Sequence, residues 1–134
     1  MTPTAYIVDD SEVDRYTARR RLTKSQRFDP VLEAADGLGF VDLFLAREAV
    51  GAEPKPLVLM DINMPQLDGF ATLRALRQRL ADLGQGWPLI AVILTSSDAE
   101  EDRQRAQDDA TVADYMTKPI TKEDVERLLR THYG

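Results

Sequence analysis

The sequence predicts a doubly wound α/β fold, in which a five-stranded parallel sheet is covered on both faces by five helices. Five short apolar runs alternate along the chain with longer stretches that have helical patterns. Within each run the apolar residues are continuous, as in strands that are buried on both faces. Strands and helices that alternate in this order form parallel sheets through right-handed crossovers.

The five predicted strands are short and differ in strength. The second is the weakest and the fourth is the most apolar. They cover residues 6–8, 31–32, 57–60, 89–94 and 112–116.

Capping signals and helical spacing define the five predicted helices. Ser11 with Asp14, and Thr121 with Asp124, are capping-box patterns that open the first and last helix. The other three helices are predicted over residues 37–50, 70–83 and 99–109. The helix over 99–109 is polar and acidic, so we expect it to be marginally stable and suited to a switching surface.

Length and composition restrict the class of protein. The 134 residues fit one domain, with a core from about 4 to 131, and only five residues follow Leu129, so no output domain is expected. The net charge of -6 argues against nucleic acid and anionic membranes as partners. The chain has no cysteine, no secretion signal and no membrane-length apolar stretch, and we expect a cytoplasmic protein.

Polar side chains gather at the ends of the predicted strands. Asp9 and Asp10 follow the first strand, and Asp61 follows the third. Thr95 follows the fourth strand, and Lys118 lies near the end of the fifth. Doubly wound sheets bind ligands at the carboxyl ends of their strands, so we expect these five side chains to meet at one edge.

This set of side chains suits the binding and transfer of a phosphoryl group. Three crowded carboxylates require a cation, and hard oxygen ligands favour Mg²⁺, with Mn²⁺ as the alternative, over zinc. An aspartate carboxylate is a nucleophile for phosphoryl transfer and yields an aspartyl phosphate. Lys118 supplies a further positive charge, so catalysis would consist of positioning and charge neutralisation.

Five short motifs occur in order along the chain. They are Asp9-Asp10, Met60-Asp61-Ile62-Asn63-Met64-Pro65, Asp68-Gly69, Leu94-Thr95-Ser96 and Tyr115-Met116-Thr117-Lys118-Pro119. From about Tyr6 to Leu129 the sequence resembles the receiver domain of bacterial two-component response regulators, the CheY-like family. The resemblance implies a flavodoxin-like sheet of order 2-1-3-4-5. It also implies a stand-alone signalling receiver rather than an enzyme, with only self-phosphorylation and slow self-dephosphorylation as its chemistry.

The resemblance also implies a role for each acidic motif residue. Asp61 would be the phosphoacceptor. Asp10 and Asp61 would ligate Mg²⁺ through their side chains, and Asp9 would do so directly or through water. Asn63 would contribute its backbone carbonyl to the same metal.

The remaining motif residues would hold and sense the phosphoryl group. Thr95 would donate a hydrogen bond to one phosphoryl oxygen and Lys118 would pair with another. Lys118-Pro119 would be a cis peptide. Tyr115 matches the aromatic switch, which swings inward when Thr95 moves toward the phosphate.

The resemblance indicates protein partners. The phosphodonor would be a sensor histidine kinase or a histidine phosphotransfer protein. The loop-rich stretches before the third and fourth strands resemble those of receivers that partner bacterial phytochrome-type kinases, which makes such a kinase one candidate. The output would be read by another protein or by a second copy, in a homodimer, through the face formed by residues 99–109, 112–116 and the last helix.

The sequence departs from the family pattern at two positions. Ser96 stands where alanine or glycine usually follows the threonine, and we expect it to narrow access to the acyl phosphate. Thr111 stands where many relatives have a glycine after the helix over 99–109, so we expect that helix to end differently.

Two other functions remain open. Phosphatases of the haloacid-dehalogenase type also use a strand-end aspartate and Mg²⁺, but they carry a second aspartate two residues later, where this chain has Asn63. A receiver-like interaction module that is not phosphorylated would have the same fold. Degenerate receivers, however, commonly lack one or more of the five strand-end polar residues, all of which are present here.

Overall fold

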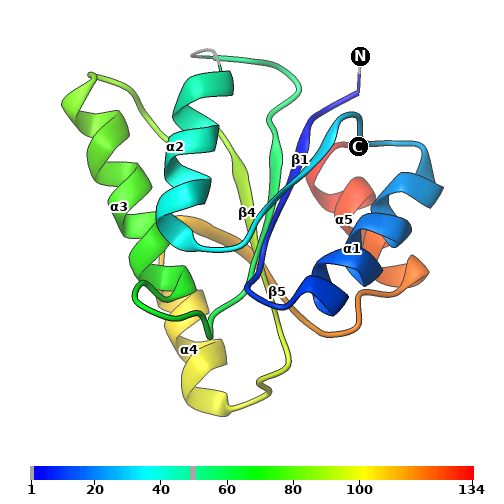
Figure 1. Cartoon of the computed structure of the whole chain (residues 1–134). Helices are drawn as coiled ribbons and strands as arrows, with labels where there is room; N and C mark the ends of the chain where they lie inside the picture. The colour runs from blue at the N-terminus through cyan, green and yellow to red at the C-terminus, as the bar shows by residue number, and fades with distance from the viewer. Residues whose placement is uncertain (1, 49–50) are drawn as a thin grey trace.

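A computed structural model describes residues 2–48 and 51–134 of the chain and contains five strands and five helices in strict alternation. Figure 1 shows their arrangement. The elements are β1 (Ala5–Val8), α1 (Glu12–Ser25), β2 (Val31–Ala34), α2 (Gly37–Arg47), β3 (Leu57–Met60), α3 (Gly69–Asp82), β4 (Ile90–Thr95), α4 (Glu100–Asp108), β5 (Val112–Thr117) and α5 (Lys122–His132).

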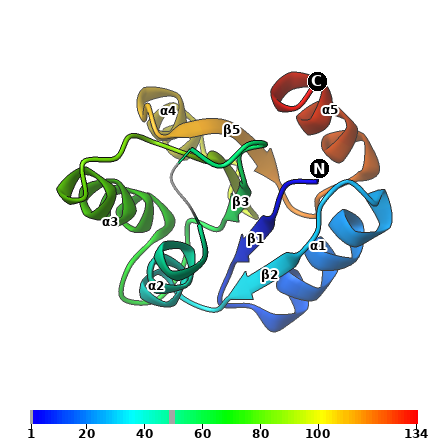
Figure 2. The same ribbon diagram turned by 90° about the horizontal axis from the view of Figure 1, so that it is seen from above.

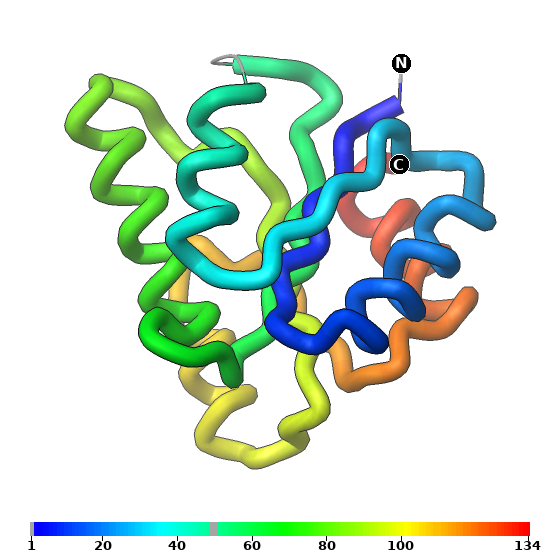
Figure 3. The backbone as a smooth tube through the Cα atoms, in the orientation of Figure 1, coloured from blue at the N-terminus to red at the C-terminus, as the bar shows by residue number. Residues whose placement is uncertain are grey.

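The five strands form one parallel sheet of order β2-β1-β3-β4-β5, which confirms the predicted fold class. The trace in Figure 3 follows the chain as it crosses back over the sheet after each strand. The register aligns the strand ends, because Val8 of β1 lies opposite Met60 of β3 and opposite Ala34 of β2. The residues that follow Val8 and Met60 are therefore neighbours at the carboxyl edge.

The helices cover the two faces of the sheet unequally. In Figure 2, α1 and α5 lie on one face, and α2, α3 and α4 lie on the other. Alternate strand residues supply the two cores: Ile7 and Leu59 pack with the first pair of helices, whereas Tyr6 and Met60 pack with the other three. Continuous apolar strands are needed because both faces are buried.

Two helices are shorter than the sequence predicts. The helix predicted over 37–50 ends at Arg47, and positions 49 and 50 lie outside the described residues. Glu48 has an extended backbone, and its carboxylate accepts a hydrogen bond from the hydroxyl of Tyr6. The helix predicted over 99–109 covers only Glu100–Asp108.

Side-chain hydrogen bonds close the C-terminal end of α4, where the chain has Thr111 and no glycine. Asp109 caps the helix with an extended backbone, and its Oδ1 accepts hydrogen bonds from the amide and hydroxyl of Thr111, at 2.9 and 2.6 Å. Trp87 Nε1 donates to the Thr111 carbonyl at 3.1 Å. Hydrogen bonds from two side chains, an acceptor on Asp109 and a donor on Trp87, therefore replace the left-handed cap, and the helix ends differently, as the sequence predicts.

The two predicted capping boxes differ in the structure. Thr121 and Asp124 form the complete reciprocal box that opens α5. At α1, Ser11 accepts a hydrogen bond from the amide of Asp14, but the amide of Ser11 donates to Asp9 Oδ1 at 2.9 Å. Asp9 thus takes the place that the Asp14 carboxylate has in a full box, and the Asp14 side chain is available for another partner.

Gly69, the first residue of α3, brings that helix against the backbone of Asp61. A Cβ atom at position 69 would lie 2.2 Å from the Asp61 carbonyl oxygen, closer than such atoms approach in proteins. The amide of Gly69 also donates to the carbonyl of Ile62 at 3.0 Å. The Asp68-Gly69 motif therefore fixes the loop that carries Asp61.

We predict that Gly69→Ala lowers the free energy of unfolding by about 1–3 kcal/mol, because the Asp61 carbonyl must move to make room. Urea denaturation measures this. Gly86→Ala is the matched control, since a Cβ there would meet nothing within 4 Å. Equal or greater stability of Gly69→Ala would show that the close approach is not a constraint.

Candidate functional site

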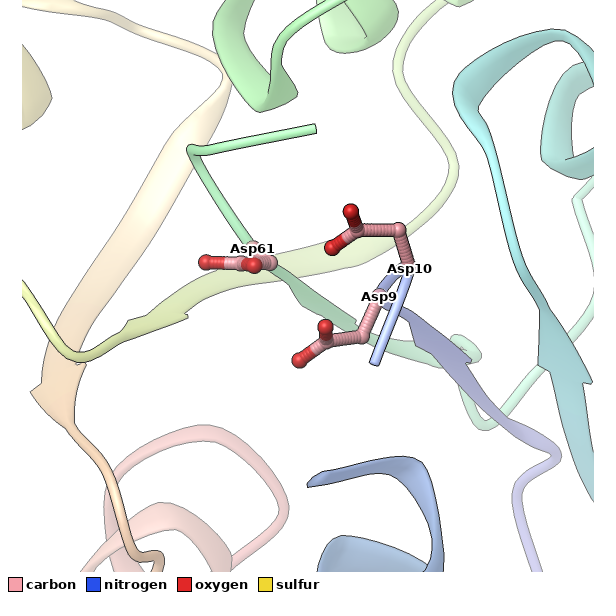
Figure 4. Close-up of side chains that lie close together, drawn as sticks. All are labelled: Asp9, Asp10 and Asp61. Carbon is pink, nitrogen blue, oxygen red and sulfur yellow. The ribbon is translucent and has the colours of Figure 1, made fainter. Parts of the chain in front are cut away.

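Three carboxylates meet at the carboxyl edge of the sheet. Asp9 and Asp10 extend from the end of β1 and Asp61 from the end of β3, as Figure 4 shows. One carboxylate oxygen from each lies within 4.8 Å of the others. Asp9 and Asp61 are only 4% and 6% exposed, whereas Asp10 is exposed.

This donor set fits a hard divalent cation. All three groups offer carboxylate oxygens, which Mg²⁺ prefers, and the set contains neither the thiolate nor the imidazole ligands that favour zinc. Buried carboxylates this close together repel one another unless positive charge is added. Asp10, the exposed member, leaves one side of the cluster open to solvent.

Lys118 supplies positive charge from the end of β5. Its Nζ lies 2.6 Å from Asp9 Oδ2 and 3.4 Å from Asp61 Oδ2, and its backbone amide donates to the Thr95 carbonyl at 2.8 Å. Lys118-Pro119 is a cis peptide, as expected. Burial lowers the pKa of Lys118, but the hydrogen bonds to Asp14 and Asp9 and the charge of Asp61 outweigh it, and the net pKa is raised.

The carboxyl group of Asp61 has a raised pKa. Burial is the main cause, and the nearby charge of Asp9 adds to it. The ammonium of Lys118 and a hydrogen bond from Thr95 act in the opposite direction without cancelling the effect. Without added cations, the folded chain thus holds the charged form of Asp61 at a cost in free energy.

Asp14 also belongs to this cluster, although its place in the sequence predicts only a capping role. Its Oδ2 lies 2.8 Å from Lys118 Nζ. Asp14 follows Asp10 by four residues, and that spacing, together with the short distance from the strand end, could have indicated that it lies near the site.

Thr95 and Tyr115 are connected through Ser97, a residue of the loop that follows β4. Thr95 is fully buried, and its Oγ1 accepts a hydrogen bond from the Ser97 amide at 3.3 Å. The Tyr115 hydroxyl donates to the Ser97 carbonyl at 2.6 Å. The two residues predicted to form the switch thus bond to the amide and to the carbonyl of Ser97.

A second missed residue, Arg103 of α4, stabilises Tyr115 in this position. Its guanidinium carbon lies 4.8 Å from the centre of the Tyr115 ring, and it donates to Thr117 Oγ1 at 3.2 Å. Nothing in the motif set indicated this residue, because arginine on a polar helix is ordinary. The cation–π contact connects α4 directly to β5.

Ser96 follows the end of β4, and Asn63 lies two residues after Asp61. Both residues are exposed. Ser96 lines a small pocket of about 220 Å³ together with Asp14 and Lys118. The expected effect of Ser96 on phosphate access remains a prediction.

Comparison with known proteins assigns the chain to a family. The model of the response regulator receiver domain family matches residues 5–130. The chain therefore belongs to the receiver domains of two-component response regulators, which act in phosphorelays and bind Mg²⁺ at an acidic pocket. Within the described part of the chain, no helix is both long and apolar enough to cross a membrane.

Similar proteins include both short regulators and large kinases. The chain is 36% identical to PilH of Pseudomonas aeruginosa, over 93% of this chain and 90% of PilH. It is 32% identical to the two-component response regulator ORR41 of Oryza sativa subsp. japonica, over 92% and 88%. It also matches the hybrid signal transduction histidine kinase L of Dictyostelium discoideum at 25%, but spans only 7% of that protein.

Solved structures agree with the fold. A two-component response regulator from Cytophaga hutchinsonii superposes with a TM-score of 0.85 at 20% identity, covering 98% of this chain and 97% of that one. Chemotaxis protein CheY4 of Vibrio cholerae gives a TM-score of 0.76 at 22% identity, with coverage of 98% and 99%.

We predict that Asp61→Asn makes the protein more stable when divalent cations are removed with EDTA. The raised pKa means that the folded state binds the Asp61 proton more tightly than the unfolded state does. The contribution of Asp61 to wild-type stability therefore falls as pH rises from below about 3.9, the ordinary aspartate value, through the higher folded pKa. Asp61→Asn escapes this loss, so its advantage in free energy of unfolding should grow over that pH range and level off above the folded pKa.

Urea unfolding of both proteins at a series of pH values measures this difference. Adding Mg²⁺ should reverse the order, because a ligand that binds the folded state stabilises it. A variant that is less stable than wild type at neutral pH in EDTA would contradict the prediction.

Proposed function

We propose that this receiver accepts a phosphoryl group on Asp61 from the phosphohistidine of a sensor histidine kinase or a histidine phosphotransfer protein. The observation that carries the proposal is the placement of Asp61 between two further carboxylates and the ammonium of Lys118. A buried carboxylate that already has a cation beside it is suited to hold a dianionic group. The family assignment supports the same conclusion.

The transfer consumes no water and needs no further reactant. An oxygen of the Asp61 carboxylate attacks phosphorus, and the new P–O bond forms as the P–N bond breaks. The electron pair of the broken bond returns to the imidazole nitrogen of the donor. Lys118 would pair with a phosphoryl oxygen, and the Thr95 hydroxyl, on the same side of Asp61, would donate to another.

Asp9, Asp10 and Asp61 would hold the Mg²⁺ ion, together with the backbone carbonyl of Asn63. The ion would neutralise charge that develops on the phosphoryl oxygens. This assignment is supported by the donor set and by the short separation of the three carboxylates.

The response would be read through altered contacts with another protein. Thr95 and Tyr115 both contact Ser97, so a shift of Thr95 toward the phosphoryl group would change the loop to which the tyrosine is bound. That loop leads into α4. A partner protein or a second copy of the chain would then bind at the face formed by α4, β5 and α5.

We predict that incubation with Mg²⁺ and acetyl phosphate adds the mass of one phosphoryl group, and that hydroxylamine removes it, because the product is an acyl phosphate. Intact-mass spectrometry measures the adduct. Asp61→Asn should carry none, and EDTA should abolish it in the wild type.

Asp42→Asn, an exposed residue of α2, is the matched control and should be labelled like the wild type. A wild type that stays unlabelled, under donors that label a known receiver, would favour an interaction module that is not phosphorylated. Continuous release of phosphate from many small esters would favour a phosphatase.

We predict that Tyr115→Phe leaves the extent of phosphorylation unchanged but weakens the response of α4. The substitution removes only the hydroxyl that donates to Ser97. Amide chemical-shift changes on adding beryllofluoride, summed over α4, measure the response, and they should fall by about half or more. Tyr133→Phe is the control, because its hydroxyl also donates to a backbone carbonyl, that of Lys55 at 2.8 Å, away from the site. Equal α4 responses in the two variants would argue against a switch role for Tyr115.

A further inference from the structure

The ammonium of Lys118 lies within ion-pair distance of three carboxylates. A lysine ammonium has three N–H donors, and Lys118 has three carboxylate partners. The distances from Nζ are 2.6 Å to Asp9, 2.8 Å to Asp14 and 3.4 Å to Asp61. The phosphoacceptor is thus the most distant of the three partners.

Asp14 reaches Lys118 because its capping role is incomplete. At α5 the equivalent residue, Asp124, directs its carboxylate back to the amide of Thr121. At α1 that position is taken by Asp9, whose Oδ1 accepts from the Ser11 amide. The Asp14 carboxylate therefore accepts a hydrogen bond from Lys118, and both residues line the same small pocket.

A phosphoryl group on Asp61 brings additional oxygen acceptors to the same ammonium. Asp14 holds this ammonium through a hydrogen bond, so a phosphoryl oxygen that pairs with Lys118 must share it with Asp14 or displace Asp14. The side chains of Asp9 and Asp61 are 5% and 7% exposed, whereas that of Asp14 is 42% exposed. Release of Asp14 costs little, because water can replace the hydrogen bond of a partly exposed carboxylate. Asp9 and Asp61 would face the Mg²⁺ ion under the proposed function, so among the three partners Asp14 is the one that lies outside the metal set and competes for the ammonium.

We infer that Asp14 competes with the phosphoryl group on Asp61 for the ammonium of Lys118, and that it lowers the affinity of the site for phosphoryl ligands. Asp14 is then a positioning residue that acts through Lys118. The inference rests on the proposed function, since it requires a phosphoryl group on Asp61. The inference predicts that replacing Asp14 increases the affinity for phosphoryl ligands, whereas replacing a residue that merely supported the fold would not.

The test is the affinity of Asp14→Asn and Asp14→Ala for beryllofluoride in saturating Mg²⁺, measured by isothermal titration calorimetry. We expect both variants to bind roughly two- to fivefold more tightly than the wild type, the scale of a partly exposed ion pair. Asp14→Ala removes the acceptor as well as the charge, so its gain should be at least as large. The initial rate of labelling by subsaturating acetyl phosphate should rise by a similar factor.

Glu12→Gln is the matched control. Glu12 is an exposed acid in the same first turn of α1, and among the described residues it is not one of the carboxylates that pair with Lys118. It should bind like the wild type, which would separate the contact with Lys118 from a general loss of charge at this helix end.

The outcomes separate the two proposals. Unchanged or weaker beryllofluoride binding by both Asp14 variants, with wild-type binding intact and the fold confirmed by thermal melting, overturns the role of Asp14 and leaves the proposed function in place. A gain of the same size in Glu12→Gln also overturns it. A wild type that fails to bind beryllofluoride at all would sink the proposed function and this inference together.

Discussion

The attraction between Lys118 and the buried carboxylates at the carboxyl edge is the interaction on which the arrangement of the site depends. Asp9 and Asp61 are almost inaccessible, and each would be costly to bury as an unpaired charge. The ammonium lies within ion-pair distance of both, so the end of β5 is held against the ends of β1 and β3. Because β4 lies between β3 and β5 in the sheet, this contact spans β4, whose Thr95 carbonyl accepts a hydrogen bond from the Lys118 amide. A cation or phosphoryl group bound at this edge would therefore change the charge balance that positions Lys118.

The surrounding structure fixes this cluster from several directions. The register of β1 and β3 sets Asp9 beside Asp61, and the close approach of Gly69 leaves the Asp61 backbone little freedom. Arg15 of α1 donates to the Asp9 carbonyl at 2.7 Å and pairs with Glu33 of β2 at 3.1 Å. The backbone at the ends of β1 and β3 is thus held by contacts with β2, α1 and α3 as well as by the pairing within the sheet.

Much of the fold could be predicted from the sequence because its signals were local. Continuous apolar runs identified the strands, and a parallel sheet brings their carboxyl ends together, so Asp9, Asp10, Asp61, Thr95 and Lys118 were all expected at one edge. The roles of these residues as phosphoacceptor, metal ligands and switch remain proposals. The helix predicted over 37–50 was too long because the apolar pattern continues in the sequence beyond the point where Glu48 turns to accept a bond from Tyr6.

Contacts between side chains far apart in the sequence were not predictable in the same way. The pairing of Asp14 with Lys118 depends on which of two carboxylates accepts from the Ser11 amide, and both were compatible with the capping pattern. The stacking of Arg103 on Tyr115 depends on the exact placement of α4 against β5. The single tryptophan, Trp87, lies at the opposite edge of the sheet from the carboxylates, with its indole bound to the carbonyl of Thr111, just beyond the end of α4. The fluorescence of Trp87 should therefore report movement of the connection between α4 and β5. It should not respond to changes at the carboxylates that leave this connection in place.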